Sequence, residues 1–230
     1  YEESFSWNPP VESNNESLIR TWSSQYLAIA NANQVLDALG KMEMTDKLRA
    51  AKGEALICRA YAHFVLVNIF CQQYDPNYPD DMGIPYMEKA ETELDPKYER
   101  GTVAEVYAKI EKDIEEGLPL IDDAIYSVPK YHFNRKAAYS FAARFFLYYQ
   151  KWDKAAEYAS EALTNAPESQ LRDYEALLEY PMNNGSTQNT AATYYISTDL
   201  PCNYLLATAY SSSGTYFGGY SSGRRYNHGW

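Results

Sequence analysis

The sequence is poor in the residues that interrupt helices and in those that cross-link small folds. Glycine and proline each occur 11 times in 230 residues, beside a hydrophobic fraction of 46%. This balance fits a folded helical protein and excludes a disordered chain. The cysteines Cys58, Cys71 and Cys202 are odd in number and contain no C-x-x-C pair. They therefore indicate neither a disulfide framework nor a zinc ribbon.

Basic residues are scarce as well. The 20 Lys and Arg face 31 Asp and Glu, which gives a formal net charge of -11. Such a charge repels phosphates, so we expect no nucleic-acid partner and no attraction to anionic membranes. The sequence has no long apolar run and starts in a polar segment at Tyr1. We therefore expect no membrane span and no signal peptide within it, and any export signal would lie upstream.

Tyrosine, in contrast, is abundant. The chain has 23 tyrosines, and aromatic residues make up 15% of it. Most should pack helices, because tyrosine buries its ring while its hydroxyl stays hydrated. Sugar-binding proteins also favour such rings, since the apolar face of a pyranose stacks on a flat aromatic. Composition alone leaves both interpretations open.

Two long helices are predicted in the first third of the chain. Apolar residues recur at helical spacing over residues 18–39, after possible capping residues at 13–15, and Gly40 closes this helix. Thr45 is a suitable N-cap for a second helix with one buried stripe, whose first half is lined by small residues. That stripe consists of Leu48, Ala51, Ala55, Cys58, Ala62, Val65 and Ile69. His63 lies beside the stripe and is expected to make a structural hydrogen bond.

A long loop is predicted between residues 71 and 101. It contains Pro76, Pro79, Pro85 and Pro96, which forbid a continuous helix. Loops of this length in a compact domain are usually functional or exposed. Calcium could bind its oxygen-rich turn, but the glycine and distal Glu of an EF-hand are missing, so a hydrated loop is favoured. The turn consists of Asp75, Asn77, Asp80 and Asp81.

Three further helices are predicted. Thr102 and Glu105 have the spacing of a capping box. The helix that follows should bury Val103, Tyr107, Ile110, Ile114, Leu118 and Ile121. Asn134 should cap the next helix, which directs Ala138, Phe141, Ala142, Phe145 and Tyr148 toward the core. After a break at residues 150–152, the last helix carries Ala155, Tyr158, Ala159, Ala162 and Leu163.

The last two helices resemble a tetratricopeptide unit. Alignment on Pro167 places Ala143, Phe146, Ala155, Ala159 and Ala162 at its packing positions. One unit cannot bury both of its faces, so the earlier helical hairpins should stack against it. We therefore predict an all-α fold of tetratricopeptide-like hairpins stacked as a right-handed scaffold, with long irregular loops and little strand.

The composition changes beyond Tyr180, where Asn, Thr and Ser become frequent. Residues 193–198 could form a short strand, and the end of the chain has no periodicity. We predict a helical domain at residues 1–180 and, at residues 181–230, a loop-rich segment that needs a further part to pack against.

Candidate ligand-binding residues lie on these polar segments, because a helical core explains their aromatic rings poorly. Arginine there could donate hydrogen bonds to sugar hydroxyls or acidic groups. The alternative is that these rings pack against a part of the protein outside this chain. The candidates are Trp7, Tyr216, Tyr220, Arg224, Tyr226 and Trp230, with Phe217 and Arg225 beside them.

No catalytic or metal-binding residue is predicted. Residues 219–223 match G-x-S-x-G, but the strand, helix, acid and histidine that a nucleophile elbow requires are absent. The adjacent Asp122 and Asp123 would point in different directions on a helix. His132 and His228 lack the spacing of a zinc site. We therefore expect neither an enzyme nor a cofactor.

Five blocks of the sequence resemble the SusD/RagB family of surface glycan-binding lipoproteins, which work with a TonB-dependent outer-membrane transporter. They are WSSQYLAIANANQVLDAL, KGEALICRAYAHFVLVNIF, GIPY, RGTVAEVYAKIEKDIEEGLPLI and NRKAAYSFAARFFLYYQKWDKAAEYASEAL. They stand in the family's order over residues 18–165. Family members are about twice as long, so this chain resembles their amino-terminal half. Cys71 departs from the family's usual Gly and should change the turn.

The resemblance implies a binding protein of polysaccharide utilisation and nutrient uptake. Such a protein captures an oligosaccharide or polysaccharide for a SusC-like transporter. It would lie on the extracellular face of the outer membrane, held by a lipid anchor outside this chain. The blocks are scaffold and transfer no ligand contact, and the family permits calcium without predicting it. Two alternatives stay open, a peptide-capturing relative and a plain tetratricopeptide interaction module.

Overall fold

The computed structural model describes residues 6, 8, 17–93, 96–163, 167–179 and 199–205. The chain forms two compact units, one of residues 25–170 and one of residues 1–24 with 171–230. The α-helices are α2 (Leu18–Leu39), α3 (Asp46–Phe70), α4 (Val103–Gly117), α5 (Arg135–Tyr148), α6 (Trp152–Leu163) and α7 (Tyr174–Leu178). The short 3-10 helices are η1 (Leu118–Leu120), η2 (Asp123–Ile125), η3 (Pro129–Tyr131) and η4 (Glu168–Gln170).

The predicted all-α fold is confirmed. Over the described ranges the chain forms no strand, and one isolated antiparallel bridge joins Met82 to Thr102. The strand considered at residues 193–198 lies outside the described residues. In the unit that contains residues 171–230, Asp173 caps α7, and Arg172 donates a hydrogen bond to Asn203 (2.6 Å).

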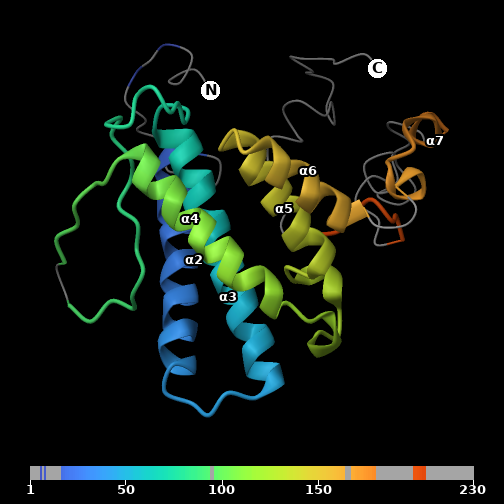
Figure 1. Cartoon of the computed structure of the whole chain (residues 1–230), viewed down its shortest axis with the longest axis horizontal. Helices are drawn as coiled ribbons and strands as arrows, with labels where there is room; N and C mark the ends of the chain where they lie inside the picture. The colour runs from blue at the N-terminus through green and yellow to red at the C-terminus, as the bar shows by residue number, and fades with distance from the viewer. Residues whose placement is uncertain are drawn as a thin grey trace, which may run out of the picture. The chain divides into compact units, whose positions relative to one another are not determined.

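Helix α3 is the centre of the larger unit (Figure 1). It was predicted to bury one stripe, and this prediction is wrong, because it is buried on nearly all sides. Arg59 bonds to α2 and to α4, while Phe64 packs on Phe141 of α5 with ring centroids 5.7 Å apart. Ile69, predicted to be buried, lies in the last turn and is 46% exposed.

Among the described helices, α3 alone is long and apolar enough to cross a membrane. In this structure most of its apolar stretch is buried inside the protein. Two of its buried residues, Arg59 and His63, are polar and have partners on other elements. These features identify α3 as a core helix.

The predicted helix caps are confirmed. Thr45 and Asn134 each accept a hydrogen bond from the backbone three residues on, and Thr102 and Glu105 form both bonds of the capping box. Helix α2 begins differently from the prediction. Its cap is Ser17, which accepts from the backbone N–H of Arg20 (3.1 Å), whereas residues 13–15 lie outside the described part.

Helices α4 and α5 supply much of the core. All six residues predicted to be buried from Val103 to Ile121 are buried, at 7% exposure or less. In α5, the predicted Ala138, Phe141, Ala142 and Phe145 are buried as well. Tyr148 is instead 52% exposed, and Phe146 is buried. Tyr148 lies in the final turn of α5, where only its edge contacts Phe64 (5.3 Å between centroids).

Helices α3 and α4 approach closely at two glycines. A Cβ atom added to Gly53 would lie 2.8 Å from the carbonyl oxygen of Gly117 and 2.8 Å from Leu120 Cβ. Because real Cβ contacts are longer, any larger residue would push the helices apart. The close helix approach is therefore at Gly53, a residue that the predicted stripe did not include.

Helices α5 and α6 form the tetratricopeptide-like hairpin. Gln150 turns the chain between them with a left-handed backbone (φ 60°). An earlier element packs against this hairpin, as predicted, because Lys151 and Lys154 pair with Glu111 and Glu115 of α4. Only Ala162 of α6 is buried, so most of the residues predicted to face the core from α6 remain partly exposed.

Cys71 is the C-cap of α3. Its backbone is extended (φ -128°, ψ 171°), a conformation that any residue adopts. Cys71 therefore avoids the left-handed conformation that glycine reaches cheaply, and the predicted change of the turn relative to a glycine stays a prediction.

Candidate functional site

The connection between α3 and α4 runs beside the helices as a long loop (Figure 1). Two hydrogen bonds, one between backbone groups and one from a side chain, join residue 83 to residues 100 and 101, and we call this crossing the neck of the loop. Gly83 N–H donates to Gly101 O (2.7 Å), and Arg100 Nε donates to Gly83 O (2.6 Å). An added Cβ at Gly83 would lie 2.6 Å from the carbonyl oxygen of Thr102, so this crossing requires glycine. The neck fixes where the loop leaves and rejoins the helices.

Residues 84–88 of the loop are bonded directly to α2 and α3. Ile84 is buried at 1% exposure, and the next residues present their carbonyl groups to the helices. The bonds run from Tyr26 Oη to Pro85 O (2.9 Å), from Asn33 Nδ2 to Met87 O (2.9 Å) and from Arg59 Nη1 to Glu88 O (3.0 Å). The GIPY block thus belongs to an anchored segment, which explains why these residue types occur there.

A buried ion pair holds this anchor together. Arg59 of α3 donates from Nε and Nη2 to both carboxylate oxygens of Asp113 in α4, at 2.7 and 2.6 Å. Tyr86 Oη donates to the same carboxylate (2.6 Å). The side chains of the pair are 9% and 5% exposed. Burial opposes the charge of Arg59, but the hydrogen bonds and charge of Asp113 outweigh it, so the pKa of Arg59 is raised.

His63 completes the cluster as a neutral side chain. Its Nε2 accepts from Met87 N–H (3.0 Å), so the proton sits on Nδ1, which donates to Arg59 O (2.9 Å). Burial, and the charges of Arg59 and Lys109, lower the pKa of His63 to about 3 although the bond to Arg59 O opposes this shift. The ring stacks on Tyr86 with centroids 3.8 Å apart. The predicted structural role of His63 is therefore confirmed.

The Arg59 cluster, defined here as Asn33, Arg59, His63, Tyr86 and Asp113, is suited to positioning rather than to chemistry. Both nitrogens of His63 are occupied, and at neutral pH its ring is uncharged. One signal for this cluster is visible in the sequence, since Asp113 is a carboxylate between Ile110 and Ile114 on the apolar face of α4. Its partner Arg59 is 54 residues away, and periodicity alone could not pair them.

Much of the rest of the described loop is exposed and partly apolar. Tyr78, Met82 and Tyr98 are 64%, 63% and 47% exposed. Asp75 accepts from the backbone and side-chain nitrogens of Asn77 (2.9 and 2.8 Å), which makes a local turn. No group of three or more metal-ligating side chains occurs within the described stretches of the chain.

A second polar cluster holds the segment before α5. His132 Nδ1 bonds to Glu54 Oε1 (2.9 Å), which also accepts from the backbone N–H of Phe133 (3.2 Å). The His132 ring stacks on Tyr126 with centroids 4.2 Å apart. Asp123, for which an acid–base role was rejected, accepts from the backbone N–H of Arg135 (2.7 Å). These contacts are structural.

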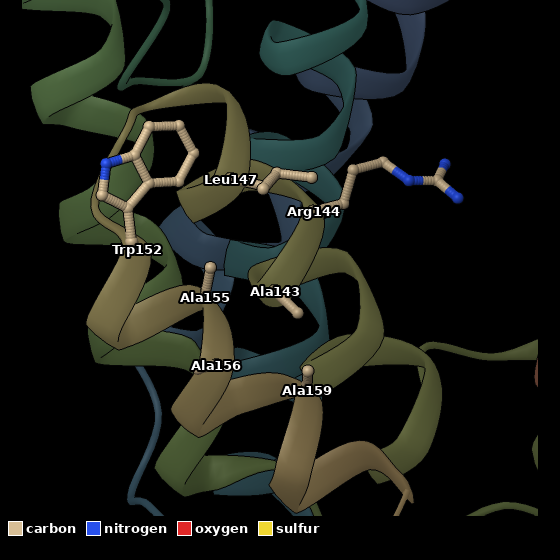
Figure 2. Close-up of a pocket in the computed structure, with 7 residues that line it drawn as sticks. All are labelled: Ala143, Arg144, Leu147, Trp152, Ala155, Ala156 and Ala159. Atoms are coloured by element: carbon tan, nitrogen blue, oxygen red, sulfur yellow. The ribbon is translucent and has the colours of Figure 1, made fainter.

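The α5–α6 hairpin carries an open hollow of about 480 Å³ (Figure 2). Figure 2 shows the indole of Trp152 at one end, Leu147 and Arg144 along the α5 side, and alanine methyls along both helices. The lining residues are Ala143, Arg144, Leu147, Trp152, Ala155, Ala156 and Ala159. Three of these alanines occupy predicted tetratricopeptide packing positions, so here small residues leave space.

The predicted ligand-binding residues do not fall in the described part of the chain. Trp7, Tyr216, Tyr220, Arg224, Tyr226 and Trp230, together with Phe217 and Arg225, lie outside it. The same holds for the G-x-S-x-G match at residues 219–223 and for His228. These assignments therefore stay predictions.

Comparison with known proteins connects this fold to one family. Residues 2–147 match the model of a SusD-like family described as starch-binding and associating with the outer membrane. A comparison with curated proteins gives no match. Among solved structures, a putative sugar-binding protein from Bacteroides vulgatus is 26% identical, with a TM-score of 0.64, and the match covers 82% of this chain and 42% of that one.

Two further solved structures agree with this match. A SusD-like carbohydrate-binding protein from Bacteroides vulgatus is 28% identical, with a TM-score of 0.58 and coverage of 74% of this chain and 35% of that one. A laminarin-binding SusD-like protein is 22% identical, with a TM-score of 0.58 and coverage of 81% and 39%, and it supports the fold alone. The chain spans less than half the length of these relatives. Since the family model matches more than half of it, the chain belongs to the SusD-like family.

Proposed function

We propose that this chain belongs to a cell-surface protein that captures an oligosaccharide or polysaccharide for uptake through a SusC-like TonB-dependent outer-membrane transporter. The match to the SusD-like family over residues 2–147 carries this proposal, since that family is described as starch-binding and associating with the outer membrane. The similarity to a solved putative sugar-binding protein supports it. In this proposal a lipid anchor outside the chain holds the protein on the extracellular face, and no catalytic step takes place.

The helical unit would serve as the scaffold of the binding protein. The neck at Gly83 and the Arg59 cluster hold the long loop at fixed points on α2, α3 and α4. Ligand contact is assigned to residues of the polar segments, at 181–230 and near the start of the chain. They are Trp7, Tyr216, Tyr220, Arg224, Tyr226 and Trp230. Their rings would stack on sugar faces and the guanidinium would donate to hydroxyl oxygens.

Calorimetric titration of the intact protein with a panel of polysaccharides that includes laminarin and starch tests this function. We expect saturable heat with at least one polysaccharide, and weaker binding by the Tyr220→Ala and Trp230→Ala variants. Tyr131→Ala is the matched control, because Tyr131 is 52% exposed on η3 and is not assigned to the ligand. Heat of dilution alone across the panel would contradict glycan capture.

The transporter partnership is tested separately. Co-expression with the candidate SusC-like transporter should give a complex that survives purification from outer membranes. Recovery of each protein alone under the same conditions would contradict this part of the proposal and leave glycan binding intact.

A further inference from the structure

The hollow on the α5–α6 hairpin presents large apolar groups to solvent. Trp152 is 59% exposed and Leu147 is 53% exposed, and both line the same hollow. Gln150 makes the left-handed turn between them, so the end of α5 and the start of α6 place these side chains side by side (Figure 2). Contiguous exposed apolar surface of this kind commonly marks a binding site.

Arg144 provides the polar group of the hollow. It is exposed, and within the described part of the chain it makes no hydrogen bond or ion pair. The neighbouring cations differ, since Lys151 and Lys154 are both engaged with carboxylates of α4. Arg144 therefore keeps its five N–H donors available to a ligand.

The volume of the hollow is sufficient for one small ring. Its volume of about 480 Å³ lies within the usual range for small-molecule sites, about 300–1,000 Å³. A pyranose can lay its apolar face on an indole while its outer hydroxyls stay hydrated. An open hollow with one donor group meets these requirements.

We propose that the hollow is a subsite for a pyranose ring of a polysaccharide, with Trp152 stacking on the sugar and Arg144 donating to its hydroxyl oxygens. The alanine floor formed by Ala143, Ala155 and Ala159 leaves the ring room to reach the indole. This subsite rests on the proposed function and adds to it a contact on the helical scaffold, away from the residues assigned above. Because few hydrogen bonds hold the ring, its contribution is a weak contact along a longer chain.

The experiment titrates laminarin and starch into the intact protein. Affinity is followed by calorimetry, and the Trp152 indole N–H is followed by NMR after assignment from the spectrum of Trp152→Ala. We expect the Trp152 signal to shift on titration, Trp152→Ala to bind about tenfold more weakly, and Trp152→Phe to keep most of the affinity. Arg144→Gln should bind the polysaccharide several-fold more weakly, whereas Tyr131→Ala should bind it as the unchanged protein does. All these side chains are exposed, so the urea midpoints should agree.

Three results would overturn the subsite, and they are distinguishable. If the protein binds a polysaccharide but Trp152→Ala binds it equally and the Trp152 signal stays fixed, the subsite is wrong and the proposed function stands. If no polysaccharide binds, both fail together. Loss of self-association or of the transporter complex in Trp152→Ala, at unchanged glycan affinity, would identify the hollow as a protein contact and would also overturn the subsite.

Discussion

Replacing Arg59 by methionine should strongly destabilise the helical unit. The substitution keeps an unbranched side chain of similar length in α3 but removes every donor. Asp113 would then lose two of its three hydrogen bonds and keep only the one from Tyr86. The carbonyl of Glu88 and the amide of Asn33 would each lose a partner as well.

The magnitude follows from the burial of the pair. With side chains 9% and 5% exposed, solvent cannot replace the lost partner of Asp113. Leaving one charge of such a pair buried alone costs about 3–5 kcal/mol. The double variant Arg59→Met/Asp113→Leu removes both charges, so it should be more stable than the sum of its single variants predicts, by about 2 kcal/mol or more.

Urea unfolding followed by far-UV circular dichroism measures these free energies. The control is Arg49→Met, because the Arg49–Asp46 pair has side chains 53% and 97% exposed and should contribute little. Equal midpoints for Arg59→Met and Arg49→Met would refute the assignment of Arg59 as the centre of the anchor. The assignment would also be refuted if the stability losses of the two single variants simply added in the double variant.

Three further predictions concern other features and use the same unfolding measurement. The pKa of His63 falls from its ordinary 6.5 to about 3 in the fold, so only the unfolded chain gains its proton between these values. From pH 7 to pH 5 the protein should therefore lose about 2 kcal/mol more stability than His63→Gln, and an equal loss would contradict this. Gly53→Ala should lower the free energy of unfolding by about 1–3 kcal/mol, although alanine has the better helix propensity. Gly40→Ala should be nearly neutral, because a Cβ atom added there meets only ordinary contacts of 3.5 Å. Similar effects of the two variants would contradict the close approach of α3 and α4 at Gly53. Thr102→Ala should cost about 1 kcal/mol through the capping box and Thr102→Ser much less, and full stability of the alanine variant would exclude the cap.

Local signals in the sequence predicted the helices well. The caps at Thr45, Thr102 and Asn134 depend on groups three residues apart. The buried stripe of α4 depends on the residues of one helix face. Both features can therefore be predicted without knowledge of the tertiary structure. The resemblance to the SusD-like family was confirmed because it relied on these same helical blocks.

Features that depend on distant partners were missed. The all-round burial of α3 arises because α2, α4, α5 and the loop approach it from different sides, which its own periodicity does not record. The exposure of Tyr148 and the hollow beside Ala159 have a similar origin. A small or aromatic residue at a packing position is covered only if another element reaches it. The proposed ligand contacts, from Trp7 and from the residues between Tyr216 and Trp230, stay predictions because these residues lie outside the described part of the chain.

Affinity electrophoresis of the intact protein in native gels that contain laminarin, starch or other polysaccharides tests glycan capture most directly. With at least one of these polymers we predict retarded migration relative to a polymer-free gel, and partial recovery of mobility in Trp230→Ala. Unchanged mobility across a broad panel, by a protein whose helical content is intact, would contradict glycan capture.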